Sequence, residues 1–433
     1  MKRLFTFFIL LSFAASAQVV FTNVDSAFAY SQRNSVSSKV SEQQRLLAKW
    51  THIAAIGNTI NFRNPITFTP TDNLMLPVSF IPVEAFGGRP GTFKQITLGQ
   101  QYVSNFNFNP QIDIINPANW ARVKSAAVNK ELTETNNLLT RKNLYESIAA
   151  CFFNIISMQE QEKLMKQNLG AADTLLQITQ NKYALGLIRE QDVNNTTVNQ
   201  LNVKDKLTQV QTSLLQQYNS LKILCDIPAG TNVSVTAPLE NSSYSSELKA
   251  TSTLQFKNSV LQSEFARSEL RANRWMMLPT VSAIYYQGWQ QNSNTEFFDS
   301  KATWIQSQYI GLRISVPFPP DANRFSQNYT AKVNYRIASL NSEHAKLQND
   351  LNNQSLNLEY DKAYSSYATA KNVYDIKNTN YQKSLNQYKE GVLSTDIILT
   401  AFTDLVNSRL SLVSSQSALE FAKTKININN IAK

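Results

Sequence analysis

The sequence predicts a mainly α-helical protein with a smaller β-stranded part suited to a membrane. Three observations predict this fold class. Only 11 Gly and 13 Pro punctuate 433 residues, and these are the residues that break helices. All prolines fall in three zones, 65–117, 228–238 and 279–320, which leaves two very long uninterrupted stretches. Inside the first and third zones, apolar and polar side chains alternate with the period of a β-strand.

The N-terminus has the pattern of a secretory signal peptide. Residues 1–17 carry a basic start at Lys2 and Arg3, an apolar run, and a small-residue cleavage site, Ala15-Ser16-Ala17. The apolar run is shorter than the ~20 residues of a membrane-spanning helix, and no later stretch approaches one. We therefore expect an exported chain, whose membrane part would have to be a β-barrel.

We expect two strands in the first proline zone, 65–117 and the residues just before it, and two in the third, 279–320. In the first zone, 59–68 places its apolar residues at even positions, and Asn and Phe alternate to the end of 95–108. In the third zone, 309–316 alternates cleanly, with Ile310, Leu312, Ile314 and Val316 on one side. Its partner is expected within 280–290. Apolar-out, polar-in strands of roughly 9–11 residues are typical of outer-membrane barrels.

Two helices of about 117–182 and 321–388 follow the strands. The first begins at Asn116-Pro117, an N-cap with Pro at the first helical position. Each helix would be ~100 Å long, a length that favours a coiled coil over a globular helix. Each ends at a glycine-centred turn and reverses into a shorter helix.

The two halves of the chain repeat each other. Tyr183-Ala184-Leu185-Gly186 is mirrored 205 positions later by Tyr388-Lys389-Glu390-Gly391. An internal duplication accounts for the order of elements. The predicted organisation is a signal peptide at 1–17, a first repeat at 18–228 (helix, strands at 59–108, long helix at 117–182, tip at 183–190, helix at 191–225), an equatorial linker at 229–248, and a second repeat at 249–433 (helix, strands at 280–316, long helix at 321–388, tip at 389–394, helix at 395–425).

Composition argues against an enzyme and against nucleic-acid binding. The net charge of +10 is spread along the chain without a Lys/Arg block. The only histidines, His52 and His344, lie far apart, and no catalytic or nucleotide-binding motif is present. We expect no catalytic residues, no metal site and no cofactor. Cys151 and Cys225 fall in predicted helices, which favours packed free thiols.

Four membrane strands per chain cannot close a barrel, since the smallest single-chain barrels have about eight. An open edge in lipid would leave backbone groups unpaired, at several kcal/mol each. Three chains would pool twelve strands, with the long helices forming a tube. The alternative is an exported coiled-coil structural spacer without channel activity, which accounts for the helices but not for two strand pairs placed before them.

The sequence resembles the TolC-like outer-membrane efflux family over nearly the whole mature chain. The resemblance lies in the duplication, the Leu278-Pro279-Thr280-Val281-Ser282 start of a strand, the Val316-Pro317-Phe318 exit, and the two Tyr-x-x-Gly tips. It implies a homotrimer with a twelve-strand barrel in outer-membrane lipid and a periplasmic α-barrel. It also implies a passive channel that serves efflux or type I secretion with a periplasmic adaptor and an inner-membrane pump.

The resemblance also implies roles for residues at the tips. Gly186, Leu187, Gly391, Val392 and Ser394 match the positions that meet the adaptor. Tyr183, Asp192, Tyr388 and Asp396 match or neighbour positions that gate the closed tip, where Tyr388 would bond to Asp192. The family's arginine two positions after the second glycine is Leu393 here, and its aspartate six positions after is Ile397. We therefore expect a closed or narrowed tip with a weaker acidic ring.

Overall fold

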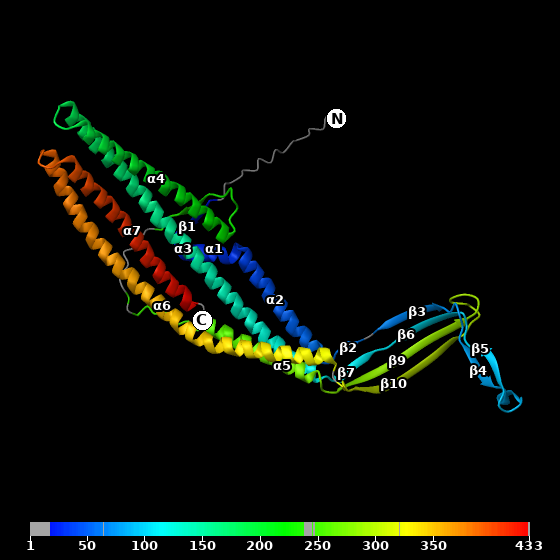
Figure 1. Ribbon diagram of the computed structural model, residues 1–433. Helices are drawn as coiled ribbons and strands as arrows, with labels where there is room; N and C mark the ends of the chain where they lie inside the picture. Colours follow the sequence, from blue (N-terminus) through cyan, green and yellow to red (C-terminus); the bar gives the residue numbers. More distant parts are fainter. Residues whose placement is uncertain (1–17, 64, 238–244, 246, 320, 432–433) are drawn as a thin grey trace, which may run out of the picture. The chain divides into compact units, whose positions relative to one another are not determined.

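The computed structural model describes residues 18–431 except 64, 238–244, 246 and 320 (Figure 1). The predicted signal peptide, and part of the predicted linker at 229–248, lie outside the described residues. The chain divides into two compact units. One consists of residues up to 44, 134–258 and 343–433, and the other of 45–133 and 259–342. We call them the helical unit and the sheet unit.

Two antiparallel helical hairpins dominate the helical unit. α3 and α4 meet at the first tip, and α6 and α7 meet at the second (Figure 1). Short elements near the N-terminus and after α4 complete it. The bounds are β1 Val19–Phe21, α1 Val24–Asn34, α2 Val36–Gly57, α3 Pro117–Ala184, α4 Glu190–Cys225, β8 Val233–Val235, α6 Ala322–Lys389 and α7 Thr395–Ile431, of which α2, α3 and α6 continue into the sheet unit.

The starts of the long helices follow from local capping. The Asn116 side chain accepts a hydrogen bond from the Asn119 backbone N–H at 3.2 Å. Asp321 does the same for Arg324 at 2.7 Å. Such caps satisfy backbone donors that a helix leaves free in its first turn. α3 and α6 then run within two residues of the predicted bounds at each end.

The helix predicted at the start of the first repeat, before the strands, is two helices in the structure. Ser35 has extended backbone (φ −64°, ψ 142°) and ends α1. The side chain of Asp226 accepts from the Val36 N–H at 2.7 Å, and the Ser35 hydroxyl accepts from the Ser38 N–H at 3.2 Å. The chain therefore restarts as α2 with a new cap, which the hydrophobic pattern alone could not indicate.

The core of the helical unit gathers segments that are distant in sequence. Phe21, Phe152 and Leu221 are almost fully buried in one cluster with residues of α1, α3, α4 and α7. β1 and β8 form a parallel pair, with Val19 opposite Val233. β8 lies inside the segment predicted as linker, so this segment contributes a strand to the core.

α7 is apolar and long enough to cross a membrane by length and composition alone, unlike any other described helix. From the sequence, no such stretch was predicted after the signal peptide. Phe402 and Val406 of α7 pack in one buried cluster, and Leu419 packs in another, all within the helical unit. We therefore assign α7 to the packed helices of that unit.

The sheet unit holds one antiparallel sheet and the helical segments next to it. The sheet has four rows in the order β2/β3, β7/β6, β9, β10, because β7 and β6 lie end to end along β9. A separate hairpin, β4–β5, follows β3. The bounds are β2 Phe62–Arg63, β3 Ile66–Asp72, β4 Val78–Pro82, β5 Phe93–Thr97, β6 Tyr102–Phe108, β7 Gln111–Ile115, α5 Leu254–Trp275, β9 Thr280–Ser293 and β10 Trp304–Ser315.

The predicted number of strands, four per chain, was wrong: the described residues contain ten strands. Pro110 separates β6 from β7, and a proline cannot donate to the ladder. The β4–β5 hairpin lies in the stretch expected to be a loop between strands. Pro77, Pro82 and Pro90 in and around it argued against strands, but here each proline lies at an end or outside the pairing. The four-row arrangement nevertheless corresponds to the four predicted strands.

Candidate functional site

The sheet has one apolar face and one polar face. Residues paired across neighbouring strands share a face. Ile66 pairs with Phe108, Phe106 with Trp289, and Leu312 with Ala283, all on what we call the apolar face. The other face, the polar face, pairs Thr69 with Asn105, Asn105 with Gln290, and Arg313 with Ser282.

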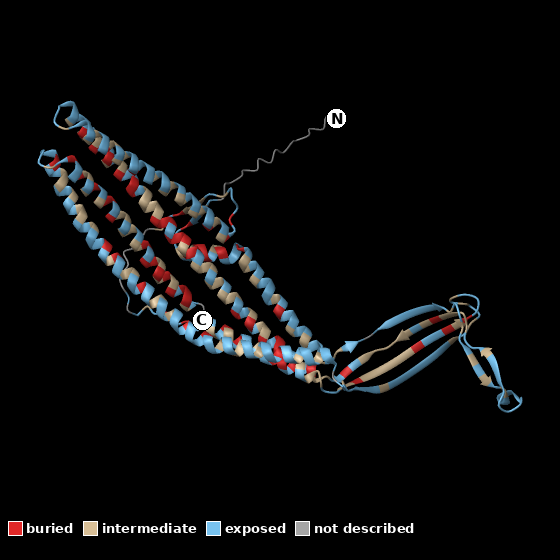
Figure 2. Cartoon of the chain, in the orientation of Figure 1, coloured by how far each residue is buried: buried red, intermediate tan, exposed pale blue. Residues whose placement is uncertain are grey.

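Large side chains on the apolar face are exposed to solvent. Ile310, Leu312 and Ile314 on β10 and Ile66 on β3 have more than half of their surface accessible. Soluble proteins rarely expose contiguous apolar patches of this kind, which mark contact with lipid or another protein. Figure 2 shows β3 and β10 exposed along most of their length, while the buried residues of the sheet lie on β6, β7 and β9.

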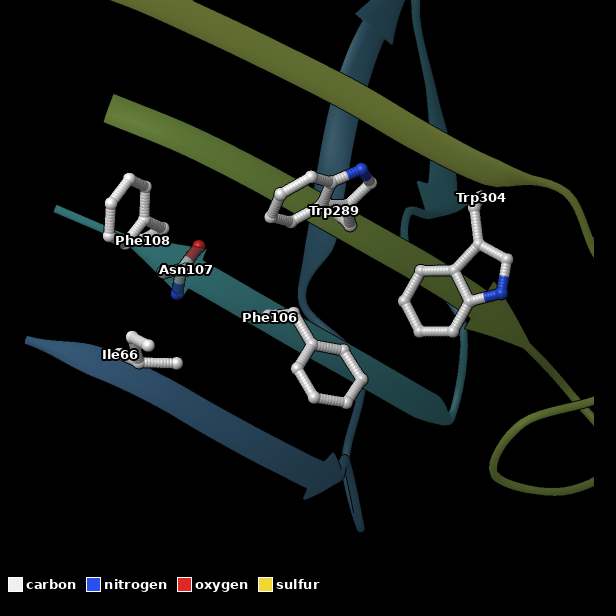
Figure 3. Close-up of a pocket in the computed structure, with 6 residues that line it drawn as sticks. All are labelled: Ile66, Phe106, Asn107, Phe108, Trp289 and Trp304. Carbon is white, nitrogen blue, oxygen red and sulfur yellow. The ribbon is translucent and has the colours of Figure 1, made fainter. Parts of the chain in front are cut away.

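Aromatic residues collect at the end of the sheet where β9 turns into β10. Phe106, Trp289 and Trp304 line an apolar cavity of about 480 Å³, together with Ile66 and Phe108 (Figure 3). The Phe68 ring stacks on Phe106 with centroids 4.4 Å apart. Aromatic girdles of this kind occur where a barrel meets the membrane–water boundary.

A buried carboxylate joins three rows on the polar face. Asp113 of β7 accepts hydrogen bonds from Ser282 of β9 at 2.7 Å and from Asn61 at 2.6 Å. The Arg63 guanidinium of β2 lies 3.1 Å from the same carboxylate. Paired and multiply hydrogen-bonded, this charge holds the rows together at the end near the helices.

The two helical tips are built by the same local geometry. Gly186 has φ +72° and Gly391 has φ +80°, the left-handed region that favours glycine. The Gly186 N–H donates to the Tyr183 carbonyl at 2.9 Å, and the Leu187 N–H donates to the Lys182 carbonyl at 3.0 Å. The same two bonds recur at Gly391 and Val392, at 3.1 and 2.9 Å. These are Schellman motifs, which end helices and satisfy their last carbonyls.

The apolar residues after each tip glycine are exposed. Leu187 is 68% exposed and Val392 is 70% exposed, and Ser394 is exposed beside α7. In a Schellman motif this residue usually packs on the helix one turn back. Here the residues at that place are Lys182 and Gln387, so the apolar side chains stay free at the surface.

The tyrosines that precede the two tips differ in burial. Tyr183 is 46% exposed, whereas Tyr388 is 1% exposed. The hydroxyl of Tyr388 lies 3.5 Å from those of Thr179 and Thr395, and Thr196 lies 3.5 Å from Thr179. The threonine and tyrosine hydroxyls therefore form a buried cluster between the two hairpins.

Lys182 adds a charged contact between the hairpins. Its ammonium donates to the Tyr388 carbonyl at 2.9 Å and lies 3.9 Å from the centre of the Tyr388 ring. Leu393 packs in a cluster with Leu175, Tyr388 and Ile398. Sequence reasoning missed Lys182 and the threonines. Their only signal was the spacing of Thr179 and Lys182, which puts both on the face of α3 that carries Leu175.

The two tip aspartates do not meet Tyr388. Asp192 accepts from the Arg189 backbone N–H at 3.0 Å, which caps the start of α4. In the described part of the chain no hydrogen bond joins Asp192 to Tyr388. Asp396 is exposed and lines a groove of about 350 Å³ beside the ion pair of Lys377 and Asp404, whose charged atoms are 2.5 Å apart. The implied Asp192–Tyr388 contact is thus not formed here.

Comparisons with known proteins agree with this architecture. Residues 90–225 match the sequence profile of a family described as "Outer membrane efflux protein". No match was found among curated protein sequences. The outer membrane protein VceC of Vibrio cholerae is 18% identical, with a TM-score of 0.67 over 94% of this chain and 95% of that chain.

Two further structures are similar over 94% of this chain. The CmeC outer membrane channel of Campylobacter jejuni is 15% identical, with a TM-score of 0.68 over 85% of its own length. The MtrE outer membrane channel of Neisseria gonorrhoeae is 13% identical, with a TM-score of 0.69 over 89% of its own length. The resemblance of this chain to the TolC-like outer-membrane efflux proteins is therefore confirmed, and its fold is theirs.

Proposed function

We propose that three copies of this chain form an outer-membrane channel. The observation that carries the proposal is the sheet. It has an exposed apolar face, an amide- and hydroxyl-rich polar face, and two outer edges, along β3 and β10, with which no other described strand pairs. In lipid, each unpaired backbone group costs several kcal/mol. Copies that join β10 of one to β3 of the next remove both edges. Three copies give the twelve rows that the family resemblance implies.

In this channel the polar face lines a water-filled pore and the apolar face meets lipid. The long hairpins form a periplasmic tube, whose tips dock a periplasmic adaptor through Leu187 and Val392 beside Gly186 and Gly391. An inner-membrane pump supplies the energy, and the channel is a passive conduit for efflux or type I secretion. Lys182 and the buried hydroxyls around Tyr388 hold the hairpins together in the closed state.

Cross-linking of the sheet edges tests this assembly. Thr69 of β3 and Ser307 of β10 lie on the polar face at opposite edges. The double variant Thr69→Cys/Ser307→Cys, treated in outer-membrane fractions with a short bifunctional maleimide, should give covalent dimers and trimers with the trimer as the largest species. Cys151 and Cys225 are buried and contribute no background.

The control is Thr69→Cys alone, which places the new thiol at one edge only and should remain monomeric. Monomers from the double variant, recovered in the soluble periplasmic fraction, would contradict the proposal and favour the coiled-coil spacer. A ladder that continues beyond the trimer would contradict closure with three copies.

A further inference from the structure

A cavity of about 570 Å³ between α5 and the start of α6 is lined by positive charge. The cationic residues that line it are Arg267, Arg271, Arg274, Lys332 and Arg336. No acidic residue is among its lining residues in the described part of the chain. We call it the basic pocket. It lies within the sheet unit and is separate from the tips and from the two faces of the sheet.

Helical spacing concentrates these charges. Arg267, Arg271 and Arg274 follow one another at four and three positions on α5, and Lys332 and Arg336 are four apart on α6. Residues at these spacings are neighbours on a helix surface, and like charges there destabilise the helix. The repulsion among these cations therefore destabilises the two helices, and a bound anion would offset it.

No described residue pairs with any of the five cations. Within the described residues, none of their side chains takes part in an ion pair or hydrogen bond. Nearby cations differ: Arg324 bonds the Met276 carbonyl at 3.0 Å, and Lys124 lies 3.6 Å from Glu264. The negative end of the α5 dipole explains Arg274 in the last turn. It does not explain the other four.

The basic pocket lies next to the start of the sheet. α5 ends at Trp275 and β9 begins at Thr280, so the pocket on α5 lies within about three helical turns of the strand. Trp275 and Tyr335 line it beside the cations. Further exposed aromatic residues, Trp120, Phe318, Phe325 and Tyr329, follow within fifteen residues of the ends of β7 and β10, where the chain passes from strand to helix. Aromatic rings and cations together are typical of the headgroup level of a membrane.

We propose that the basic pocket binds the phosphate headgroup of an anionic phospholipid in the leaflet that faces the helices. This inference rests on the proposed function, because that function puts the sheet in a bilayer. Guanidinium groups donate paired hydrogen bonds to phosphate oxygens. A volume of about 570 Å³ accommodates a headgroup.

Native mass spectrometry of the full chain with phosphatidylglycerol or phosphatidylcholine tests the proposal. The wild-type protein should retain phosphatidylglycerol in preference to phosphatidylcholine. The variant Arg271→Gln/Arg336→Gln should bind phosphatidylglycerol roughly tenfold more weakly or worse, because it removes two of the positive charges that would contact the headgroup. Lys362→Gln/Lys371→Gln is the matched control: both lysines are exposed on α6 outside the pocket, and binding should be unchanged.

Other occupants of the basic pocket give different results. Displacement of the lipid by millimolar inorganic phosphate would indicate a site for a free anion and overturn the proposal. Loss of the oligomer in the pocket variant without added lipid would indicate a second copy of the chain as occupant, and would also overturn it. A conducting oligomer that shows no preference between the two lipids would overturn this inference alone. A chain that neither conducts nor fractionates with the outer membrane would overturn the proposed function as well.

Discussion

Lys182 makes a short polar contact between the two helical hairpins near their tips. Lys182 contributes both a hydrogen bond to the Tyr388 carbonyl and a contact with the Tyr388 ring. A partly desolvated cation–π contact is worth about 0.5–2 kcal/mol, and a hydrogen bond from a charged group about 1.5–3 kcal/mol. The hydroxyl contacts of Tyr388 are long at 3.5 Å and contribute less.

Replacing this lysine should loosen the tip. Lys182→Met keeps an unbranched, flexible side chain and removes the charge, so we expect the reconstituted channel to show a higher open probability or conductance in planar bilayers. Tyr388→Phe, which removes only the long hydroxyl contacts, should have a smaller effect. Lys383→Met on exposed α6 is the control. Equal conductance for Lys182→Met and Lys383→Met would contradict a role for Lys182 in closure.

For Asp192, the sequence indicated its position at the start of a helix but not the group that it contacts. The sequence indicated an acidic residue at the start of α4, and the structure uses it as a helix cap. Leu393 was identified as a departure from the family pattern, but only the packing against Leu175 and Ile398 explains it. Contacts between hairpins depend on the rotation of one helix about its axis relative to the other, which the sequence pattern does not specify.

Burial raises the pKa of both cysteine thiols. Burial raises the pKa of Cys151 from 9.0 to about 11 and, with the neighbouring Cys151 and Asp226, raises that of Cys225 to about 12. Both thiols are free, as the sequence predicted. We expect neither to react with a disulfide-forming thiol reagent at pH 8 until the chain is unfolded, because the thiolate is the nucleophile.

The same shift makes the fold weaker in alkali. Above pH 9 the thiols of an unfolded chain ionise while those of the folded chain keep their protons, so the folded chain binds more protons. The free energy of unfolding should therefore fall as pH rises from 9 toward 11. Denaturant titrations should show a shallower fall for Cys151→Ser/Cys225→Ser, and identical slopes for both chains would contradict the assignment.

At the tips, the helix reversal depends on glycine. Gly186→Val should destabilise the α3–α4 hairpin by about 1–2 kcal/mol, because a β-branched residue is strained at positive φ. The matched control is Gly170→Ala within α3, where an added Cβ would meet no atom within 4 Å and should stabilise the helix by about 0.5–1 kcal/mol. Thermal unfolding of both variants checks the difference. We expect cross-linking to the adaptor to be impaired in Gly186→Val alone.

The long helices and β10 were the elements that the sequence predicted best. Their signal is local: caps, an absence of breakers, and strict alternation such as Ile310, Leu312 and Ile314. The first half of the sheet was harder, since Pro65, Pro70 and Pro110 interrupt its pattern. β6 and β7 lie end to end because both pair with β9, which belongs to the other repeat. Such long-range pairing cannot be predicted from local sequence patterns.

For the assembled protein, the decisive contrast is between the faces of the sheet. Leu312→Lys puts a charge on the apolar face and should cost about 2–4 kcal/mol per copy at the middle of a bilayer. Ser307→Lys puts the same charge on the polar face of the same strand and should leave assembly intact. Recovery of heat-sensitive oligomer from outer-membrane fractions measures both. Comparable loss in the two variants would contradict the assignment of lipid-facing and pore-facing sides.

The unpaired edges of the sheet also affect how the protein is assembled. In the proposed assembly, a newly exported copy has unpaired backbone groups at β3 and β10 until it meets its neighbours, so completion of the sheet depends on encounters between molecules. The rate of assembly should therefore rise steeply with expression level. At low expression, single copies would stay exposed to proteases and to wrong strand pairing with other β-rich proteins. Biogenesis, more than the stability of the finished pore, would then set how many channels a cell can hold.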